Sequence, residues 1–556
     1  MPPGSDPPPL AEPDAIVVGS GATGGVAAMV LAEAGLRVLV LEAGPSLTAR
    51  QAYGGEPANM VRRLAHLSSG RHRVQAHHPG YWKQNPELFI DERRNPYTTP
   101  PERPFLWTRG RQLGGKSLTW GGITLRLSDY EFKAGERDGH GPSWPIGEQE
   151  LAPYYTRLET LLGVHGHPDG LPQLPDGHFL DPLPLTPGER HLQRAAAEQL
   201  DLPLIHSRGF GLHRGRGWAR SASTGSTLAR ALATGRTTVR TGAVVSHVVM
   251  RPDGSRARGV VVVDSTSGAR QQLDAPLVVL CASTIETLRI VLHSSEGNTA
   301  SSGRGLVDPS GSLGRYLMDH ISTSRFFSIP DVEPPPEPPE LSGAGSCFIP
   351  NTVNLEPGSP LEFRRGYGLW AAVQRFDPPS LLQRRRGEAV GFLIGHGEVL
   401  PQSTNHVTLN PDRLDAWGLP TPHISLAWGP NETAMVAHMQ RRMDAVVAAA
   451  GGTVRPIEEI FVLPLLEPWI RGSFATRSGA PPPGYYIHEL GGARMAAREE
   501  DGVVNPQNQC WRAPNLLVTD GACWPSAGWQ SPTLTEMAIT WRACEAAATR
   551  LRRGEG

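Results

Sequence analysis

The stretch Asp14-Ala-Ile-Val-Val-Gly19-Ser-Gly21-Ala-Thr-Gly24-Gly25 lies near the start of the 556-residue chain and joins an apolar run to closely spaced glycines. The run from Ala15 to Val18 predicts a short strand buried on both faces, as in a parallel sheet. The residues from Val26 to Ala34 predict a helix. A buried strand, a glycine-rich turn and a helix in this order indicate an α/β fold.

The three glycines of this stretch have separate structural roles. Gly19 permits the tight turn after the strand, Gly21 lets the backbone approach a phosphate, and Gly24 allows the helix to pack closely on the strand. The helix N-terminus then presents free N–H groups and a partial positive charge to an anion. The pattern therefore predicts a dinucleotide pyrophosphate site, with a plain glycine-rich loop of an α/β unit as the alternative.

A second apolar strand, from Arg37 to Leu41, ends at an acidic residue, Glu42. A carboxylate at this point accepts hydrogen bonds from both ribose hydroxyls of adenosine and repels a 2′-phosphate. Because both strands, the helix and the acid are in register, we predict a dinucleotide site here.

A second informative segment, His488-Glu-Leu-Gly-Gly-Ala-Arg494-Met495, lies near the other end of the chain. The apolar run Leu517-Val-Thr follows it and ends at Asp520-Gly521. The histidine and the acid-glycine turn are placed to reach the same cofactor as the N-terminal glycines. A chain whose two ends meet at one cofactor suggests a flavoenzyme.

Composition excludes several classes of protein. The formal net charge is −1 and the isoelectric point is about 7.0, so no bulk field favours nucleic acid or an anionic membrane as a partner. No apolar run approaches the ~18 residues that a membrane-spanning helix needs. The N-terminus from Met1 to Pro13 is proline-rich and lacks the apolar core of a secretory signal, which predicts a disordered tail over residues 1–12.

The five cysteines are few, odd in number and without a C-x-x-C pair. This pattern indicates reduced thiols and a cytoplasmic location rather than a disulfide framework or a zinc site. His72, His77 and His78 have no acid or cysteine at ligand spacing, so a polar loop is expected there and no metal site is predicted.

The middle of the chain returns to strand patterns after a long irregular insertion. The runs Val244 to Met250 and Gly259 to Val263 flank an Asp-Gly turn. Leu277 to Ala282 predicts another buried strand, followed by a helix from about Thr284 to Leu292. Further helices are predicted at Leu151 to Leu162, around Ala434 to Ala450, and at Pro532 to Leu551.

At this point the chain resembles the glucose–methanol–choline (GMC) flavin oxidoreductases over most of its length. The resemblance is nearer to the bacterial pyranose oxidase-like and gluconate dehydrogenase-like branch than to choline oxidase. The matching segments are the N-terminal fingerprint, Arg111 to Gly122, Cys281 to Thr287, Gly314 to His320, His488 to Met495, Asp520-Gly521, and Pro532 to Thr535.

The resemblance implies FAD in a doubly wound α/β domain and an α+β substrate domain built on an antiparallel sheet. The predicted FAD-binding domain is discontinuous and comprises residues 13–50, 105–125, 205–325 and 486–553. Residues 51–104, 126–204 and 326–485 are predicted to form the substrate-binding domain and cap. The implied cofactor contacts are Gly19, Gly21, Ala22, Thr23, Gly24, Glu42, Arg111, Gly114, Gly115, Thr119, Trp120, Gly121, Gly122, Val244, Ala282, Asp520, Gly521, Pro532 and Thr533.

The chain departs from the family pattern at two positions. Some relatives carry a histidine in the glycine-rich segment that bonds covalently to the flavin, and the matching residue here is Thr119. FAD is therefore expected to be held non-covalently. The family's second catalytic residue is a histidine or asparagine directly before a proline, and here it is Ser531, with Gln530 beside it as the other candidate.

The resemblance assigns the catalytic base to His488. An alcohol is too weak an acid to ionise unassisted, and histidine is the side chain suited to take its proton near neutral pH. A hydride then passes from the substrate carbon to flavin N5, and Ser531 is expected to hydrogen-bond the developing alkoxide. Glu489 is a candidate to orient His488, and His320 matches a position of structural or cofactor-supporting role.

The predicted activity is oxidation of an alcohol group on a small sugar, glycoside or polyol, with oxygen or a separate molecule as electron acceptor. The alternatives are a redox-silent lyase of the same family, a light-driven decarboxylase, and a flavin-binding protein without catalysis. Four tryptophans are candidates to stack on the substrate or to belong to the core: Trp107, Trp370, Trp417 and Trp529.

Overall fold

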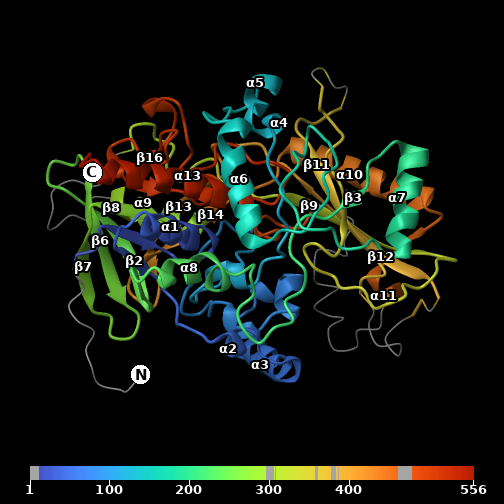
Figure 1. Cartoon of the computed structure of the whole chain (residues 1–556), viewed down its shortest axis with the longest axis horizontal. Helices are drawn as coiled ribbons and strands as arrows, with labels where there is room; N and C mark the ends of the chain where they lie inside the picture. The colour runs from blue at the N-terminus through green and yellow to red at the C-terminus, as the bar shows by residue number, and fades with distance from the viewer. Residues whose placement is uncertain are drawn as a thin grey trace.

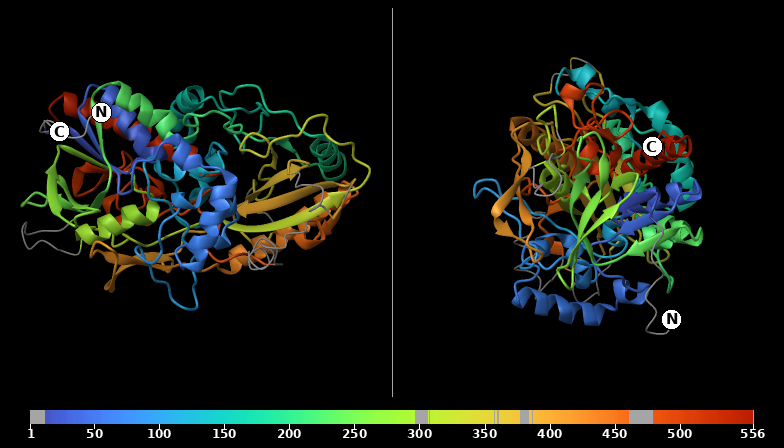
Figure 2. Two further views of the ribbon diagram at one scale, coloured as in Figure 1. Left: turned by 90° about the horizontal axis from the view of Figure 1, so that it is seen from below. Right: turned by 90° about the vertical axis from the view of Figure 1, so that its left-hand side faces the viewer.

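The computed structural model describes residues 12–295, 306, 308–356, 358, 361–376, 384–385, 387–460 and 479–555. The predicted tail 1–12 lies outside these residues except for Glu12, as do residues 461–478 of the predicted substrate domain. Two six-stranded sheets lie side by side along the molecule, each covered by helices (Figures 1 and 2).

The first sheet is built around the predicted N-terminal strand. β1 (Ala15–Val18) is fully buried and pairs in parallel with β2 (Val38–Leu41) and with β8 (Leu277–Leu280). The strand order is β16-β17-β8-β1-β2-β4, and only β16 is antiparallel to its neighbour. The remaining strands are β4 (Thr237–Arg240), β16 (Gln509–Cys510) and β17 (Ala513–Val518).

Helices cover both faces of this sheet, which confirms the predicted doubly wound α/β fold. α1 (Ala22–Glu33) packs beside α8 (Thr227–Ala233) and α13 (Thr533–Arg552) on one face, and α9 (Thr284–Ser295) lies on the other (Figure 2). α1 begins at Ala22 rather than at the predicted Val26. The helix includes Gly24, whose hydrogen faces the Gly19 carbonyl so closely that a Cβ would lie 2.0 Å from its oxygen.

The second sheet is antiparallel and has the strand order β15-β9-β12-β11-β10-β3. One of its faces packs against α7 (Pro187–Leu200) and the long helix α10 (Pro430–Ala449), as Figure 1 shows. Its strands are β3 (Ile205–His206), β9 (Ile321–Ile329), β10 (Cys347–Ile349), β11 (Tyr367–Val373), β12 (Ala389–Gly397) and β15 (Thr453–Arg455).

The other strands in the described ranges form two smaller sheets. The predicted pair forms a sheet as β5 (Ala243–Met250) and β6 (Ala257–Asp264), with β7 (Arg270–Asp274) added at its edge. The hairpin of β13 (His406–Leu414) and β14 (Pro420–Ser425) forms the other. Within the described ranges, the remaining α-helices are α2 (Ala49–Tyr53), α3 (Glu56–Ser68), α4 (Asp129–Phe132), α5 (Ala134–Asp138), α6 (Glu148–Leu162) and α11 (Ile457–Ile460).

The predicted division into an FAD-binding and a substrate-binding domain remains a proposal, with one adjustment. β3 and the first residues of β9 belong to the antiparallel sheet, although residues 205–325 were assigned to the FAD-binding part. The strand pairing of β3 with β10 is long-range and has no local sequence signature. Among the described residues, no helix has the length and apolar character needed to cross a membrane.

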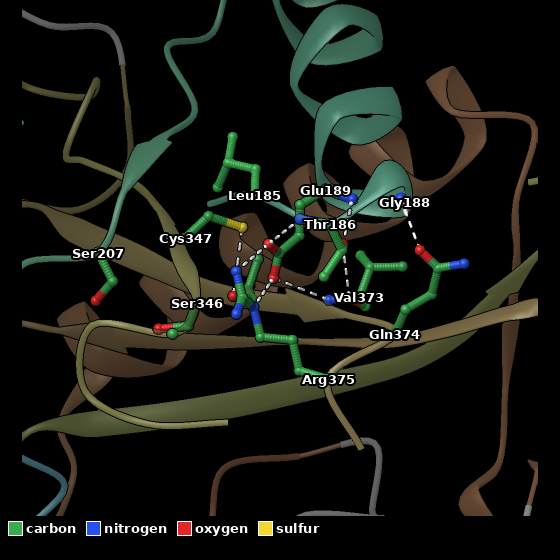
Figure 3. A network of polar contacts seen from close by, with 12 residues as sticks. Leu185, Thr186, Gly188, Glu189, Ser207, Ser346, Cys347, Val373, Gln374 and Arg375 are labelled. Atoms are coloured by element: carbon green, nitrogen blue, oxygen red, sulfur yellow. Dashed lines mark hydrogen bonds and ion pairs between the residues drawn. The ribbon is translucent and has the colours of Figure 1, made fainter. Parts of the chain in front are cut away.

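A buried ion pair joins α7 to the end of β11 (Figure 3). Arg375 Nε donates to Glu189 Oε1 and Nη2 donates to Oε2, both at 2.7 Å, and both side chains are almost completely inaccessible to water. Glu189 Oε2 also accepts from the backbone N–H of Thr186 at the start of α7. The carboxylate thus satisfies a helix cap and a buried guanidinium at once.

We expect Arg375→Met to destabilise the protein by about 3–5 kcal/mol, because it leaves the Glu189 carboxylate buried without its counter-charge. The measurement is the unfolding midpoint in urea. Arg498→Met is the matched control, since Arg498 pairs with Asp501 at the surface and both side chains are about half exposed or more. Equal midpoints for the two variants would contradict this role of the buried pair.

Candidate active site

A cavity of about 530 Å³ lies where the carboxyl ends of β1, β2 and β8 face the antiparallel sheet. The volume is within the ~300–1,000 Å³ that is usual for small-molecule sites, and crevices at strand ends are where α/β sheets bind ligands. The predicted site residues that line it are Gly19, Gly21, Ala22, Thr23, Glu42, Arg111, Gly115, Thr119, Trp120, Gly121, Gly122, Val244, Ala282, His488, Asp520, Ser531, Pro532 and Thr533.

Three predicted residues, Gly24, Gly114 and Gly521, are not among those that line the cavity. Gly24 packs against the Gly19 carbonyl, which is the helix–strand contact expected of it. Gly114 has a φ of 96° and donates its N–H to Ser20 Oγ at 2.9 Å. Gly521 has no room for a side chain because a Cβ would lie 2.4 Å from Thr284 Oγ1. All three shape the cavity wall from behind.

The fingerprint glycines have the geometry that a phosphate cradle needs. Gly19 has a φ of 98°, and a Cβ there would lie 2.3 Å from the Cys281 carbonyl oxygen. A Cβ on Gly21 would meet nothing within 4 Å, although Gly21 lines the cavity at the N-terminus of α1. The open side of Gly21 therefore faces space in which a ligand phosphate fits.

Glu42 lies at the end of β2 and is buried. Its Oε2 accepts from Ser20 Oγ at 2.5 Å and its Oε1 accepts from the Gly44 N–H at 2.8 Å. Burial raises the pKa of Glu42 above its usual value, and these hydrogen bonds oppose the rise. The carboxylate is held rigidly at the cavity edge, as a ribose-binding acid must be.

Three arginines surround one carboxylate farther along the cavity wall. Arg109, Arg111 and Arg289 lie close to Glu286, with the Arg111–Glu286 contact at 2.9 Å. Burial opposes ionisation of Glu286, but the positive charges of Arg289, Arg111 and Arg109 outweigh it and lower its pKa to about 2. The cluster carries an excess of positive charge, which suits an anionic ligand.

Several further carboxylates line the cavity near the start of α9. Asp520 lines it beside Glu536, whose pKa rises to about 8 because of burial and the nearby charge of Asp520. Glu489 also lines it and accepts from Lys116 Nζ at 3.0 Å. These contacts do not support the expectation that Glu489 orients His488, because its carboxylate pairs with Lys116 whereas His488 is contacted by Asp319 and His320.

His488 lines the cavity and is held from behind. Its backbone N–H donates to Asp319 Oδ1 at 3.0 Å, and its Nδ1 lies 2.7 Å from Nδ1 of His320. The Nε2–H of His320 donates to the Gly528 carbonyl. Burial and the neighbouring His320, His396 and Lys116 hold the pKa of His488 well below its usual value, so the imidazole is neutral at neutral pH.

Ser531, which directly precedes Pro532, reaches the cavity, whereas its neighbour Gln530 does not. Ser531 lines it together with His488, whereas Gln530 is completely buried and is absent from the lining. A Cβ on Gly528 would lie 2.7 Å from Gln530 Oε1, which shows that the amide packs against Gly528. The hydroxyl is thus the polar group available at the position of the family's second catalytic residue.

The four tryptophans separate into two groups. Trp107 and Trp370 line the cavity. Trp417 stacks on Arg111 with the guanidinium 4.8 Å from its ring, and Trp529 is 1% exposed in a hydrophobic cluster. Only Trp107 and Trp370 remain candidates to contact a ligand.

Sequence reasoning missed several residues of the cavity wall. The start of β9 contributes Ser322, Thr323 and Ser324, which begin two residues after the matched segment ending at His320. Tyr486 lines the cavity two residues before His488 and stacks on His396 with ring centroids 5.2 Å apart. Their proximity to recognised motifs was the available signal. Their side-chain directions depend on the pairing of β9 with β12.

Comparison with known proteins agrees with this geometry. The N-terminal GMC oxidoreductase model matches residues 13–322 and the C-terminal model matches residues 401–540. The chain belongs to the GMC oxidoreductase family. It is therefore a GMC-type, FAD-dependent oxidoreductase acting on CH–OH groups, as predicted.

Among its relatives is the 2-methyl-1,2-propanediol dehydrogenase of Mycolicibacterium austroafricanum, which is 27% identical over 571 residues, covering 95% of this chain and 94% of that protein. The gluconate 2-dehydrogenase flavoprotein of Pantoea cypripedii is 23% identical over 623 residues, covering 97% of this chain and 94% of that protein. The crystal structure of pyridoxine 4-oxidase from Mesorbium loti matches with a TM-score of 0.62 at 18% identity, covering 96% of this chain and 98% of that one. This last likeness shows the fold alone.

The cavity residues fit FAD, the cofactor of this family. Gly21 leaves open space at a helix N-terminus, and Glu42 is a rigid acid at the end of the second strand. The positive excess around Glu286 suits the negative charge of a pyrophosphate. Among the described residues, no group of three or more histidine, cysteine or acidic side chains is arranged to hold a metal ion.

We expect Gly21→Ala to fold normally but to bind FAD at least tenfold more weakly, because its new methyl group enters the space left for the cofactor. The measurement is FAD content and dissociation constant from visible absorption. Gly19→Ala is the informative contrast, since its Cβ meets the Cys281 carbonyl and it should lose the fold itself. A Gly21→Ala protein with wild-type FAD affinity would contradict the cradle.

Proposed function

We propose that the protein oxidises an alcohol group on a sugar, glycoside or polyol-like substrate, with His488 as the base. The observation that carries the proposal is a neutral, buried imidazole in the wall of the predicted FAD cavity, with the Ser531 hydroxyl in the same wall. We propose further that FAD is bound non-covalently, because Thr119 stands where some relatives have a flavin-linked histidine.

In this mechanism bound FAD supplies the hydride acceptor. His488 takes the hydroxyl proton of the substrate at the ring nitrogen that faces the cavity. The Ser531 hydroxyl donates a hydrogen bond to the oxygen as negative charge develops on it. Both side chains are fixed before substrate arrives, so little reorganisation is needed during the reaction.

The cavity wall supports a small hydroxylated substrate. Ser322 and Ser324 supply hydroxyl groups, and Trp370 and Tyr486 supply aromatic surface. The Thr323 hydroxyl instead accepts from Gln440 Nε2 on α10. Hydroxyls beside aromatic rings are suited to the alternating polar and apolar faces of a sugar or polyol. The named relatives, a propanediol dehydrogenase and a gluconate dehydrogenase, support the same class. Oxygen or a separate acceptor would remove the electrons, and the unpaired cysteines favour a cytoplasmic location.

The first test is anaerobic bleaching of the flavin absorption by a panel of sugars, glycosides, polyols and aryl alcohols. Bleaching by one class names the substrate class. A bound flavin that none of these compounds bleaches would instead favour a redox-silent lyase, and the short Ser531 side chain is compatible with that function.

Acid precipitation should release FAD into solution, whereas flavin retained on the protein would contradict non-covalent binding.

We expect His488→Ala to keep FAD but to slow flavin reduction by several orders of magnitude, since no other base takes the hydroxyl proton. Ser531→Ala should cause a smaller loss, about 10- to 100-fold, because it removes one hydrogen bond to the alkoxide. Stopped-flow reduction of each variant measures both effects. A His488→Ala protein that reduces its flavin at the wild-type rate would refute the assignment.

The pH dependence provides a separate prediction. The base is active when neutral, so the rate falls as pH drops through the pKa of His488, which lies below its usual value. The positive charge of Lys116 contributes to this lowering. Lys116→Met should therefore move the acid limb of the reduction rate to higher pH, by up to about one unit. Lys133→Met should leave the limb in place, because Lys133 lies at the surface, where it pairs with Asp129.

A further inference from the structure

His320 lies directly behind the proposed base. Its Nδ1 is 2.7 Å from His488 Nδ1, and its Nε2 hydrogen-bonds the Gly528 carbonyl on the far side. His320 is 1% exposed and is not part of the cavity wall. It therefore contacts the base without being placed to contact the substrate.

The positions of the hydrogens on His488 and His320 follow from the hydrogen bonds that each ring makes. A carbonyl oxygen only accepts, so Nε2 of His320 must carry a hydrogen. Burial lowers the pKa of His320 to about 4, which leaves the ring neutral and Nδ1 with a lone pair. The hydrogen between the two rings then belongs to His488 Nδ1. The opposite arrangement would require His320 to be a buried imidazolium.

We propose that His320 is a positioning residue that holds His488 in its Nδ1–H tautomer and so leaves the lone pair of Nε2 free for the substrate hydroxyl. The inference rests on the proposed function of His488 as the base. In the reaction, the substrate O–H bond would break as an Nε2–H bond forms on His488, and bound FAD would supply the acceptor for the hydride of the substrate carbon. The His488–His320 hydrogen bond then becomes charge-assisted and stabilises the new imidazolium.

The backbone holds the two rings in this relation. Asp319 Oδ1 accepts from the backbone N–H of His320 at 2.8 Å and from that of His488 at 3.0 Å. One carboxylate oxygen thus fixes both main chains, although the two histidines are 168 residues apart. The base is oriented by a neutral ring, whereas the histidine of a serine protease triad is oriented by an aspartate.

Two substitutions of His320 separate this role from simple packing. His320→Asn places an amide oxygen near the former Nδ1, so His488 Nδ1–H keeps an acceptor. His320→Gln reaches toward Gly528 but offers no acceptor beside His488. We expect flavin reduction within about threefold of wild type for the asparagine variant and about 100-fold slower for the glutamine variant. FAD content and the substrate dissociation constant should be unchanged in both.

Equal losses of the flavin reduction rate in the two variants would show that His320 acts only through packing, and would overturn the proposal. A His320→Gln variant that reduces its flavin at the wild-type rate would also overturn it. A second readout needs no substrate. In the holoenzyme labelled with ¹⁵N-histidine, two-bond ¹H–¹⁵N correlations report each tautomer, and the His488 signals are those lost in His488→Gln. We expect the Nδ1–H tautomer in the wild type and a mixture in His320→Gln.

An Nε2–H tautomer of His488 in the wild type would overturn the inference whatever the activity. Failure of the proposed function gives a different result, since the Nδ1–H tautomer would be present but no alcohol would reduce the flavin. The two failures are therefore distinguishable.

Discussion

The carboxylate of Asp319 holds together the segments on which the site depends. Its Oδ1 accepts from the backbone N–H groups of His320 and His488, and its Oδ2 accepts from that of Gly484 at 2.7 Å. The adjacent bridge between Met318 and Leu490 continues the same contact. Strand β9 of the antiparallel sheet begins at the next residue after His320. A single buried side chain therefore sets the C-terminal segment against the sheet that faces the cavity.

The cavity wall carries buried charged groups of both signs. Arg109, Arg111 and Arg289 surround Glu286, and burial raises the pKa values of Asp520 and Glu536. Burial strengthens charge interactions relative to water. It also lowers the pKa of His488 and so keeps the imidazole neutral, which is the state a base requires.

Local patterns predicted much of the fold. β1, β2 and β8 were placed correctly because buried parallel strands are uniformly apolar, and the helix predicted over Pro532 to Leu551 forms as α13. β7 was missed because it is a polar, mostly exposed edge strand without an apolar face. Glu489 was misjudged for a different reason: the direction of a side chain in an irregular segment depends on its tertiary partner, here Lys116.

The sequence by itself determined the α/β class, the FAD fingerprint, the family and the identity of the candidate base, since each depends on short local motifs, although the motifs that indicate the family are spread along the chain. Only the tertiary structure decided that Ser531 and not Gln530 reaches the cavity, and that His320 bonds to His488. Hydrogen bonds between residues so far apart leave no periodic trace in the sequence. They form only when the two sheets have brought the segments together, and for that reason they could not be predicted from local patterns.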